Sequence, residues 1–406
     1  MNKIICLIIC LFTVPFFNAQ QLEILIEQAL KNNPEIQQFE LRYNIASEKV
    51  NEVNTIPNTE FGVGYFISEP ETRTGAQRFK VSVKQMLPWF GNITARENYA
   101  SSLAEAKYED IVIAKRKLIA SVSQSYYNLY VNNAKQTILT ENIKLLITYE
   151  TLLLTSVELG KASAVDVLRL QIRQNEIQQL FDVLQQEFIA EKTAFNNLLN
   201  RENTRIINVI SELNLPTEDF EIYAKNLALH PELLKYDKLY QSVEQSEFLN
   251  QKERRPMFGF GFDYINVDKR PEMNFSDNGK DIVMPMVSIS IPLFNKKYQS
   301  TTKQNKLQQE EIAAQKQARL NTLETLLDKA KNDRISARIH HAAQAKNLKQ
   351  AKNAEAILMK GYETGTTHFN DVLEIQALQF KFQLNQIEAV KAYYVQTTLI
   401  NYLTNQ

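Results

Sequence analysis

The segment GKASAVDVLRLQ at residues 160–171 returns in altered form as GTTHFNDVLEIQ at residues 365–376. Two further blocks recur in the same order: NNPE at 32–35 as LHPE at 229–232, and LPWF at 87–90 as IPLF at 291–294. Three matched blocks at a nearly constant spacing indicate an internal duplication. We therefore expect two structural repeats, residues 20–202 and 221–406, joined by a proline-containing connector at residues 203–220.

The first residues, 1–19, have the pattern of a secretory signal peptide. Lys3 precedes an apolar run, residues 4–14, and Ala19 suits the cleavage position. The run is too short for a transmembrane anchor, which needs roughly 20 apolar residues. Both cysteines, Cys6 and Cys10, would leave with this segment. The mature chain is therefore expected to hold no disulfide, thiol ligand or lipid-bearing cysteine.

Charge and hydropathy narrow the remaining possibilities. The chain has 46 Lys+Arg and 46 Asp+Glu, so no overall charge favours nucleic acid. No later stretch is long and apolar enough to predict a transmembrane helix. An exported chain without a transmembrane helix is expected to be either a soluble periplasmic protein or a β-barrel in the outer membrane.

Each repeat carries two segments in which apolar and polar residues alternate, and this period predicts strands. The expected strands lie at about residues 58–68, 77–87, 257–267 and 281–291. Their length suits tilted strands that cross a membrane. Four strands cannot close a barrel, and an open sheet edge in lipid leaves backbone groups unpaired. We therefore expect an oligomer, in which two copies would give eight strands and three would give twelve around a pore.

Very long helical stretches without proline follow the strand pairs, at about residues 92–159 and 296–363. Each would be roughly 100 Å long at 1.5 Å per residue, which is rare in soluble globular domains. A short glycine-containing turn and a returning helix of about half that length complete each repeat. Heptad-spaced apolar residues in the returning helices predict coiled-coil pairing.

This order of elements resembles the outer-membrane efflux proteins typified by TolC. The likeness spans the mature chain and is most specific at residues 33–35, 230–232, 160–171 and 361–373. The run at residues 79–92 looks most like the metal-efflux branch of that family.

The resemblance implies a mainly α protein with a membrane β-barrel, built from a duplicated helix, strand, strand, long helix, helix unit. It implies a homotrimer with a 12-stranded barrel in the outer membrane and a 12-helix periplasmic tunnel. It also implies a passive exit duct for small molecules or metal cations, docked to a periplasmic adaptor (a membrane fusion protein) and an inner-membrane pump of the resistance-nodulation-division type. Two alternatives stay open: the outer-membrane duct of a type I protein secretion system, and a soluble periplasmic coiled-coil adaptor.

The same resemblance places Asp166, Tyr362, Asp371 and Glu374 at the periplasmic entrance, where they would gate the tunnel. Thr367 stands where the family has a gating arginine, so the closed state is expected to be held differently or more weakly. On spacing alone, Asp166 and Asp371 also suit helix N-capping, in which a carboxylate accepts backbone N–H bonds.

Two further pairs of residues have expected roles. Gly160 and Gly365 lie in the only breaks of the long hairpins far from the strands, so these tips are expected to contact the adaptor. Trp89 and Phe90 follow a predicted strand and suit an aromatic anchor at the membrane interface.

No catalytic group, cofactor site or metal site is expected, and the chain is not expected to be an enzyme. His340 and His341 are adjacent, so they diverge by about 100° on a helix and do not form a ligand pair. Met284 and Met286 share one strand face, and thioethers can hold Cu(I). The favoured expectation is that these two methionines fill the apolar surface of the barrel.

Overall fold

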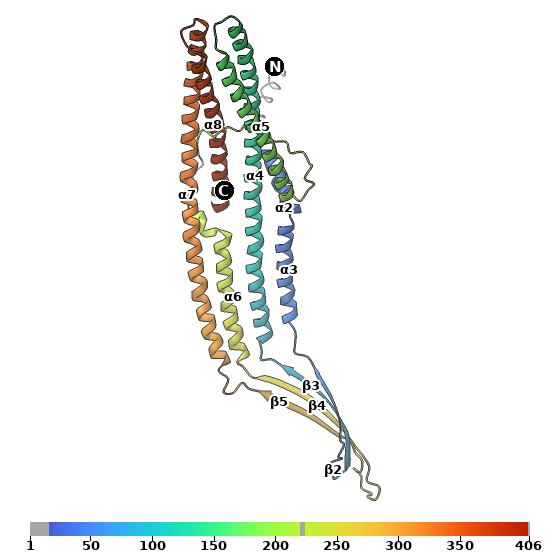
Figure 1. Ribbon diagram of the computed structural model, residues 1–406. Helices are drawn as coiled ribbons and strands as arrows, with labels where there is room; N and C mark the ends of the chain where they lie inside the picture. Colours follow the sequence, from blue (N-terminus) through green and yellow to red (C-terminus); the bar gives the residue numbers. More distant parts are fainter. Residues whose placement is uncertain (1–15, 220–223, 405–406) are drawn as a thin grey trace, which may run out of the picture. The chain divides into compact units, whose positions relative to one another are not determined.

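A computed structural model describes residues 16–219 and 224–404. The predicted signal peptide lies outside these ranges except for residues 16–19, and Phe220 of the connector also lies outside them. Figure 1 shows the elements, which in chain order are α2 (Phe16–Asn32), α3 (Pro34–Val53), β1 (Glu60–Tyr65), β2 (Glu71–Thr72), β3 (Gly75–Leu87), α4 (Asn92–Glu158), α5 (Ala164–Leu198), the 3₁₀ helix η1 (Ala224–Leu229), α6 (Pro231–Glu253), β4 (Met257–Val267), β5 (Ile282–Ser290), α7 (Lys297–Glu363) and α8 (Phe369–Thr404).

The chain divides into two compact units. The unit that we call the hairpin unit comprises residues up to Gln38, Val112–His230 and Leu320–Gln406. The other, the strand unit, comprises Phe39–Ile111 and Pro231–Arg319. Within the described residues, no helix combines the length and apolar character needed to cross a membrane.

The strand unit contains one antiparallel sheet in the order β1-β3-β4-β5, and the short β2 pairs with the start of β3. The central pairing, β3 with β4, joins a strand of each expected repeat, with Ser82 opposite Asp263. Strand β1 is shorter than the alternating pattern predicts, and β2 lies between the two segments expected as strands in the first repeat. Within this chain, β1 and β5 are the two edges of the sheet.

The register separates the side chains onto two faces, because directly opposed residues in antiparallel strands point to the same side. The aromatic face carries Phe61, Val63, Tyr65, Phe79, Phe258, Phe260, Phe262, Val283, Val287 and Ile289. The opposite face, which we call the glycine face, carries Glu60, Gly62, Gly64, Lys80, Ser82, Lys84, Met86, Met257, Gly259, Gly261, Asp263, Ile265, Ile282, Met284, Met286, Ser288 and Ser290. Large apolar side chains stay uncovered on the aromatic face: Val63 is 81% exposed and Val287 is 75% exposed.

The helices of the strand unit are tied together by charge pairs across their apolar seams. Lys235 of α6 lies 2.6 Å from Asp110 of α4, and Lys238 donates to Glu105 at 2.8 Å. Such partly exposed pairs contribute little energy each, so they fix alignment more than stability.

The hairpin unit contains two helical hairpins, α4 with α5 and α7 with α8 (Figure 1). Buried leucines recur every seven residues along α4, at Leu139, Leu146 and Leu153. Leu170 and Ile177 begin a matching heptad row on α5, and both are in the same core cluster. This spacing keeps one apolar seam facing its partners, as in coiled coils, and so explains why the long helices pair.

The connector crosses this unit without regular secondary structure, and side chains of the helices satisfy its backbone. The Tyr126 and Tyr130 hydroxyls on α4 accept the N–H groups of Ile210 and Leu213. On α8, the Tyr394 hydroxyl donates to the Asn214 carbonyl at 2.5 Å. The connector is therefore fastened to both hairpins of the unit.

Candidate functional site

The two turns at the ends of the hairpins have the same backbone geometry. Gly160 and Gly365 adopt φ values of +67° and +75°, a conformation that other residues rarely take. In the first turn Lys161 N–H donates to the Ser156 carbonyl, and in the second Thr366 N–H donates to the Gly361 carbonyl, at 2.8 and 2.9 Å. These are the six-to-one bonds of a Schellman motif, which ends a helix with a left-handed glycine. The local sequence therefore determines a sharp reversal at each tip.

Asp166 and Asp371 occupy the third helical position of α5 and α8, not the capping position. The N-cap of α5 is Ser163, whose hydroxyl accepts the Val165 N–H at 3.2 Å. The Asp371 carboxylate accepts the His368 N–H at 3.3 Å, which is the returning half of a capping box. Asp371 is thus not the N-cap residue itself, but its carboxylate accepts a backbone N–H one turn back, as the capping alternative expected of an acid at the helix start.

A chain of polar contacts links α5 to α8 just beyond the tips. Arg169 lies 3.6 Å from Asp166 and its Nη1 donates to Asn370 Oδ1 at 3.5 Å. Asn370 in turn donates to Glu374 at 2.8 Å. The structure therefore brings Asp166 and Glu374 into one network through Arg169, a residue that sequence reasoning did not single out. The available signal was charge reversal, since Arg169 and Glu374 are equivalent positions of the recurring segment.

Tyr362 and Thr367 secure the second turn. The Tyr362 ring packs edge-on against the buried Phe369, with 5.1 Å between ring centroids. Its hydroxyl is buried and has no hydrogen-bond partner among the residues that the structure describes. The Thr367 hydroxyl donates to the Leu358 carbonyl of α7 at 3.1 Å. At the position where the resemblance implies an arginine, this chain therefore makes a bond within its own hairpin.

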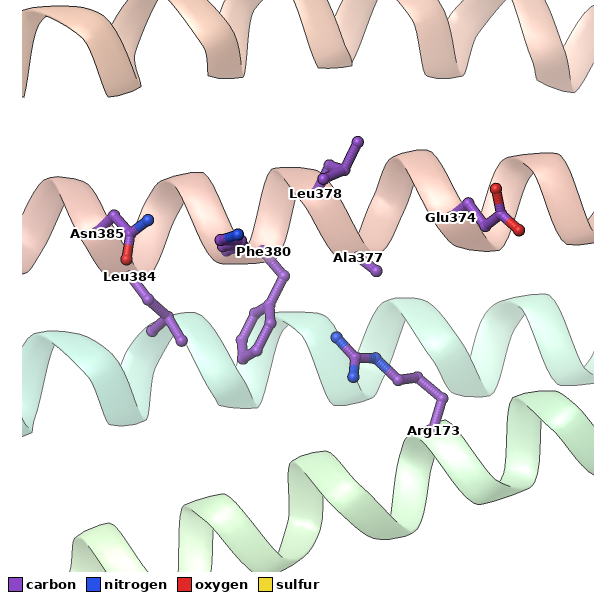
Figure 2. Close-up of a pocket in the computed structure, with 8 residues that line it drawn as sticks. Arg173, Glu374, Ala377, Leu378, Phe380, Leu384 and Asn385 are labelled. Atoms are coloured by element: carbon purple, nitrogen blue, oxygen red, sulfur yellow. The ribbon is translucent and has the colours of Figure 1, made fainter.

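A cleft of about 930 Å³ opens between the two turns and is lined by both tips, including Asp166, Tyr362 and Thr367. A second hollow, of about 610 Å³, lies along α8 (Figure 2). There Arg173 reaches from α5 toward α8, and its guanidinium lies over the Phe380 ring at 5.7 Å from the centroid. The tip region thus combines acidic, basic and aromatic groups on surfaces open to solvent.

Hydrogen bonds also stiffen the hairpins behind the tips. Gln171 and Gln174 of α5 donate to the two oxygens of Glu150 on α4, at 2.7 and 3.0 Å. These bonds lower the pKa of the Glu150 carboxyl. The Tyr149 hydroxyl donates to Glu355 of α7 at 2.8 Å, and burial raises the pKa of this phenol. At neutral pH the Glu150 carboxyl is therefore ionised and the Tyr149 phenol is neutral.

Trp89 and Phe90 lie where β3 ends, beside the aromatic face. Trp89 stacks on Phe258 of β4 with 5.6 Å between centroids, and Phe90 is 82% exposed. Phe294, the equivalent of Phe90 in the second repeat, is fully exposed. Sequence reasoning missed Phe294, although it matched the two blocks that contain these residues.

The expected position of Met284 and Met286 is wrong. The register places both on the glycine face, on the opposite side of the sheet from Val283 and Val287. They therefore do not fill the apolar surface. Of the two histidines on α7, His340 is exposed, whereas His341 lies 3.2 Å from Gln386 on α8. Among the described residues, no group of three His, Cys, Asp or Glu side chains is arranged to hold a metal ion.

Comparison with known proteins gives one family and one fold. A model of the outer membrane efflux protein family matches residues 25–199. The CusC channel has a TM-score of 0.79 at 14% identity, over 95% of this chain and 92% of that one. VceC from Vibrio cholerae gives 0.75 at 17% identity, over 95% and 96%. The MtrE channel of Neisseria gonorrhoeae gives 0.75 at 14% identity, over 95% and 89%.

No curated protein matches this chain by sequence. At these identities, the solved structures establish a shared fold, which is that of TolC-like channels. The matched family model describes efflux proteins of the outer membrane. The sequence of residues 25–199 is thus similar to the outer membrane efflux protein family, and 95% of the chain shares the fold of the CusC channel.

Proposed function

We propose that this protein is the outer-membrane channel subunit of a tripartite efflux system and acts as a passive exit duct. The observation that carries the proposal is the two-faced sheet of the strand unit. Its aromatic face suits lipid. Its glycine face combines small, polar and charged side chains with four methionines and two isoleucines, and we assign this face to a water-filled lumen. An enzyme would need a catalytic arrangement, and the proposed duct needs none.

The open edges of the sheet support assembly. In lipid, the unpaired N–H and C=O groups of β1 and β5 would cost several kcal/mol each. Pairing of β5 with β1 of the next copy removes both edges, and three copies close a 12-stranded barrel with room for a pore. In the same homotrimer, the four long and returning helices of each chain would form a 12-helix periplasmic tunnel.

The mass of the detergent-purified protein and its conductance in a planar bilayer test this assembly together. We expect a trimer that resists mild detergent and forms discrete channels. A monodisperse monomer that still conducted ions would contradict the trimeric barrel. Release of the protein from membranes without detergent would favour the alternative of a soluble periplasmic adaptor.

The aromatic residues at the strand ends support an interface with outer-membrane lipid. Trp89 stacks on the aromatic face, and the exposed Phe90 and Phe294 would lie at the same level in the two repeats. Aromatic rings of this kind favour the boundary between hydrocarbon and water. We propose that these three residues mark the periplasmic boundary of the membrane.

The tips are proposed as the docking site for a periplasmic adaptor that connects the channel to an inner-membrane pump of the resistance-nodulation-division type. A β-carbon at Gly160 or Gly365 would meet no atom within 4 Å, so each tip is open to a partner. Gly160→Trp and Gly365→Trp should therefore abolish export while leaving barrel insertion intact. Gly160→Asn is the control, because asparagine tolerates positive φ and adds a much smaller side chain than tryptophan. Normal export by both tryptophan variants would argue against docking at the tips.

We further propose that Asp166, Tyr362, Asp371 and Glu374 gate the periplasmic entrance. The contacts through Arg169 and Asn370 support a closed state held between α5 and α8, in place of the arginine that Thr367 replaces. Threefold symmetry would repeat the exposed Asp371 and Glu374 into a ring of six carboxylates. Acidic rings favour cations in pores. The proposed cargo is accordingly small molecules or metal cations, and a secreted polypeptide remains the alternative that the identity of the pump would decide.

A further inference from the structure

Methionine is concentrated on one face of the sheet. The chain has 7 methionines, and four of them lie on the glycine face: Met86 on β3, Met257 on β4, and Met284 and Met286 on β5. Directly opposed residues place Met86 beside Gly259, Met286 beside Gly261 and Met284 beside Asp263. Met257 lies two residues before Gly259 on β4, on the same face of the sheet. Met284 and Met286 are alternate residues of β5 and so lie about 7 Å apart. Met86 and Met257 lie on β3 and β4, so the four side chains form a row that crosses three neighbouring strands.

Gly259 and Gly261 of β4 have no side chains, so the backbone of β4 is bare in the middle of this row. A β-carbon at Gly259 would lie 2.6 Å from Met86 Sδ and would also crowd the Ser288 hydroxyl. A β-carbon at Gly261 would lie 3.3 Å from the terminal methyl of Met286. Methionines from the two flanking strands therefore lean over bare backbone from opposite sides. Their unbranched side chains have three rotatable bonds, so small rotations can bring the sulfurs closer.

The charges beside this row are balanced. Lys80 forms an ion pair with Asp263, whose side chain is fully buried. Lys84 stands directly opposite Glu60 in the register. A hard cation such as Mg²⁺ binds free carboxylates and water, and the acids of this face have basic neighbours. Thioether sulfur is instead a soft ligand that selects soft monovalent ions.

We propose that Met257, Met86, Met286 and Met284 form a thioether ladder that binds soft monovalent cations such as Ag(I) or Cu(I). If the proposed trimer is correct, the ladder lines the lumen, and three copies supply repeated weak sites along it. Weak, repeated binding is what conduction needs, because an ion must enter each site and also leave it.

The test is titration of Ag⁺ into the full mature protein in detergent, with ¹³C-labelled methionine methyl groups observed by NMR. We expect saturable shifts of the ladder methyls and no shift of Met359, which lies on α7 in the hairpin unit. Met86→Leu combined with Met286→Leu should weaken Ag⁺ binding at least tenfold, because leucine conserves volume and removes the sulfur. Met359→Leu is the matched control and should bind as the wild type.

Three outcomes would overturn the ladder: unchanged Ag⁺ affinity in the double variant, equal shifts at Met359, or the same shifts with Mg²⁺. Shifts caused by a neutral apolar dye but not by Ag⁺ would instead identify the row as a surface for apolar cargo. Bilayer conductance of the double variant separates this inference from the proposed function. Lost Ag⁺ binding with normal channels supports the ladder, whereas absent channels in the wild type would refute the duct itself.

Discussion

The connector should detach from the hairpin unit when the carboxylate of Asp219 is removed. This carboxylate accepts hydrogen bonds from Arg338 and from the Tyr393 hydroxyl, each at 2.5 Å. Arg338 also donates to the Pro216 carbonyl at 2.7 Å, and Arg334 lies 3.9 Å from the other carboxylate oxygen. One acid therefore ties the end of the connector to both α7 and α8.

The expected magnitude follows from these contacts. Asp219→Ala removes two bonds to a charged group, each contributing about 1.5–3 kcal/mol. It also leaves Arg334, whose side chain is 8% exposed, without this counter-charge. Because the Asp219 side chain is itself 24% exposed, solvent screens part of the effect. We expect the free energy of local opening to fall by about 3 kcal/mol, which corresponds to roughly a hundredfold larger opening constant.

Amide hydrogen exchange, followed by mass spectrometry on peptides covering residues 207–219, measures this change. Exchange in these peptides should accelerate on the order of a hundredfold in Asp219→Ala at neutral pH, unless other local unfolding events already allow exchange at that rate. Glu218→Ala removes a neighbouring exposed acid and should leave exchange as in the wild type. Exchange within twofold of the wild type in Asp219→Ala would refute the reasoning.

The same contact should respond to acid. Burial raises the pKa of the Asp219 carboxyl, but the bonds from Tyr393 and Arg338 and the charges of Arg334 and Arg338 together lower it below its usual value. A lowered pKa means that the stabilisation is fully present above the usual value of about 3.9 and is lost as the pH falls through the lower, folded value. Connector protection should therefore be constant from pH 7 to 5 and decline below about pH 4. Asp219→Asn should remove this decline.

Two further predictions concern the gate and the sheet. Asp371→Ala combined with Glu374→Ala should reduce cation preference and weaken divalent block on the order of tenfold in single-channel recordings, because the proposed acidic ring is lost. Unchanged selectivity would return Asp371 to the helix-start role that its bond to a backbone N–H already supports. In the sheet, a β-carbon at Gly75 would overlap the Asp268 carbonyl at a φ of +138°, whereas one at Gly64 would meet nothing within 4 Å. Gly75→Ala should therefore lower the free energy of unfolding of the sheet by about 3 kcal/mol. The trimer should then dissociate at a lower temperature on gels, whereas Gly64→Ala, the control, should dissociate as the wild type. Equal dissociation temperatures for the two variants would contradict this account.

Local periodicity was enough to predict the kind and the length of most elements. The long helices were expected at residues 92–159 and 296–363, and α4 and α7 occupy Asn92–Glu158 and Lys297–Glu363. The alternation of side chains along a strand is also a local property, and it already indicated on which face of the sheet Met284 and Met286 lie. Because they alternate with Val283 and Val287, their parity alone places them opposite the apolar face. That expectation failed since their apolar character was weighed above their register.

The candidate gate could be predicted only in part. The recurring segment and the family resemblance pointed to Asp166, Tyr362, Asp371 and Glu374. Neither indicated that Arg169 would contact Asn370 across 201 positions of sequence. A contact between two helices depends on their relative rotation and axial shift, and no single helix encodes these in its own pattern.

The sequence by itself therefore determined the duplicated pattern, the helix lengths, the two-faced strands and the sharp turns at Gly160 and Gly365, because each depends on residues close together in the chain. Only the tertiary structure decided that β3 pairs with β4, that the connector is clamped through Asp219, and that four methionines from three strands share one face. These features join residues far apart in sequence, and their free energy arises only when the packed elements bring the partners together.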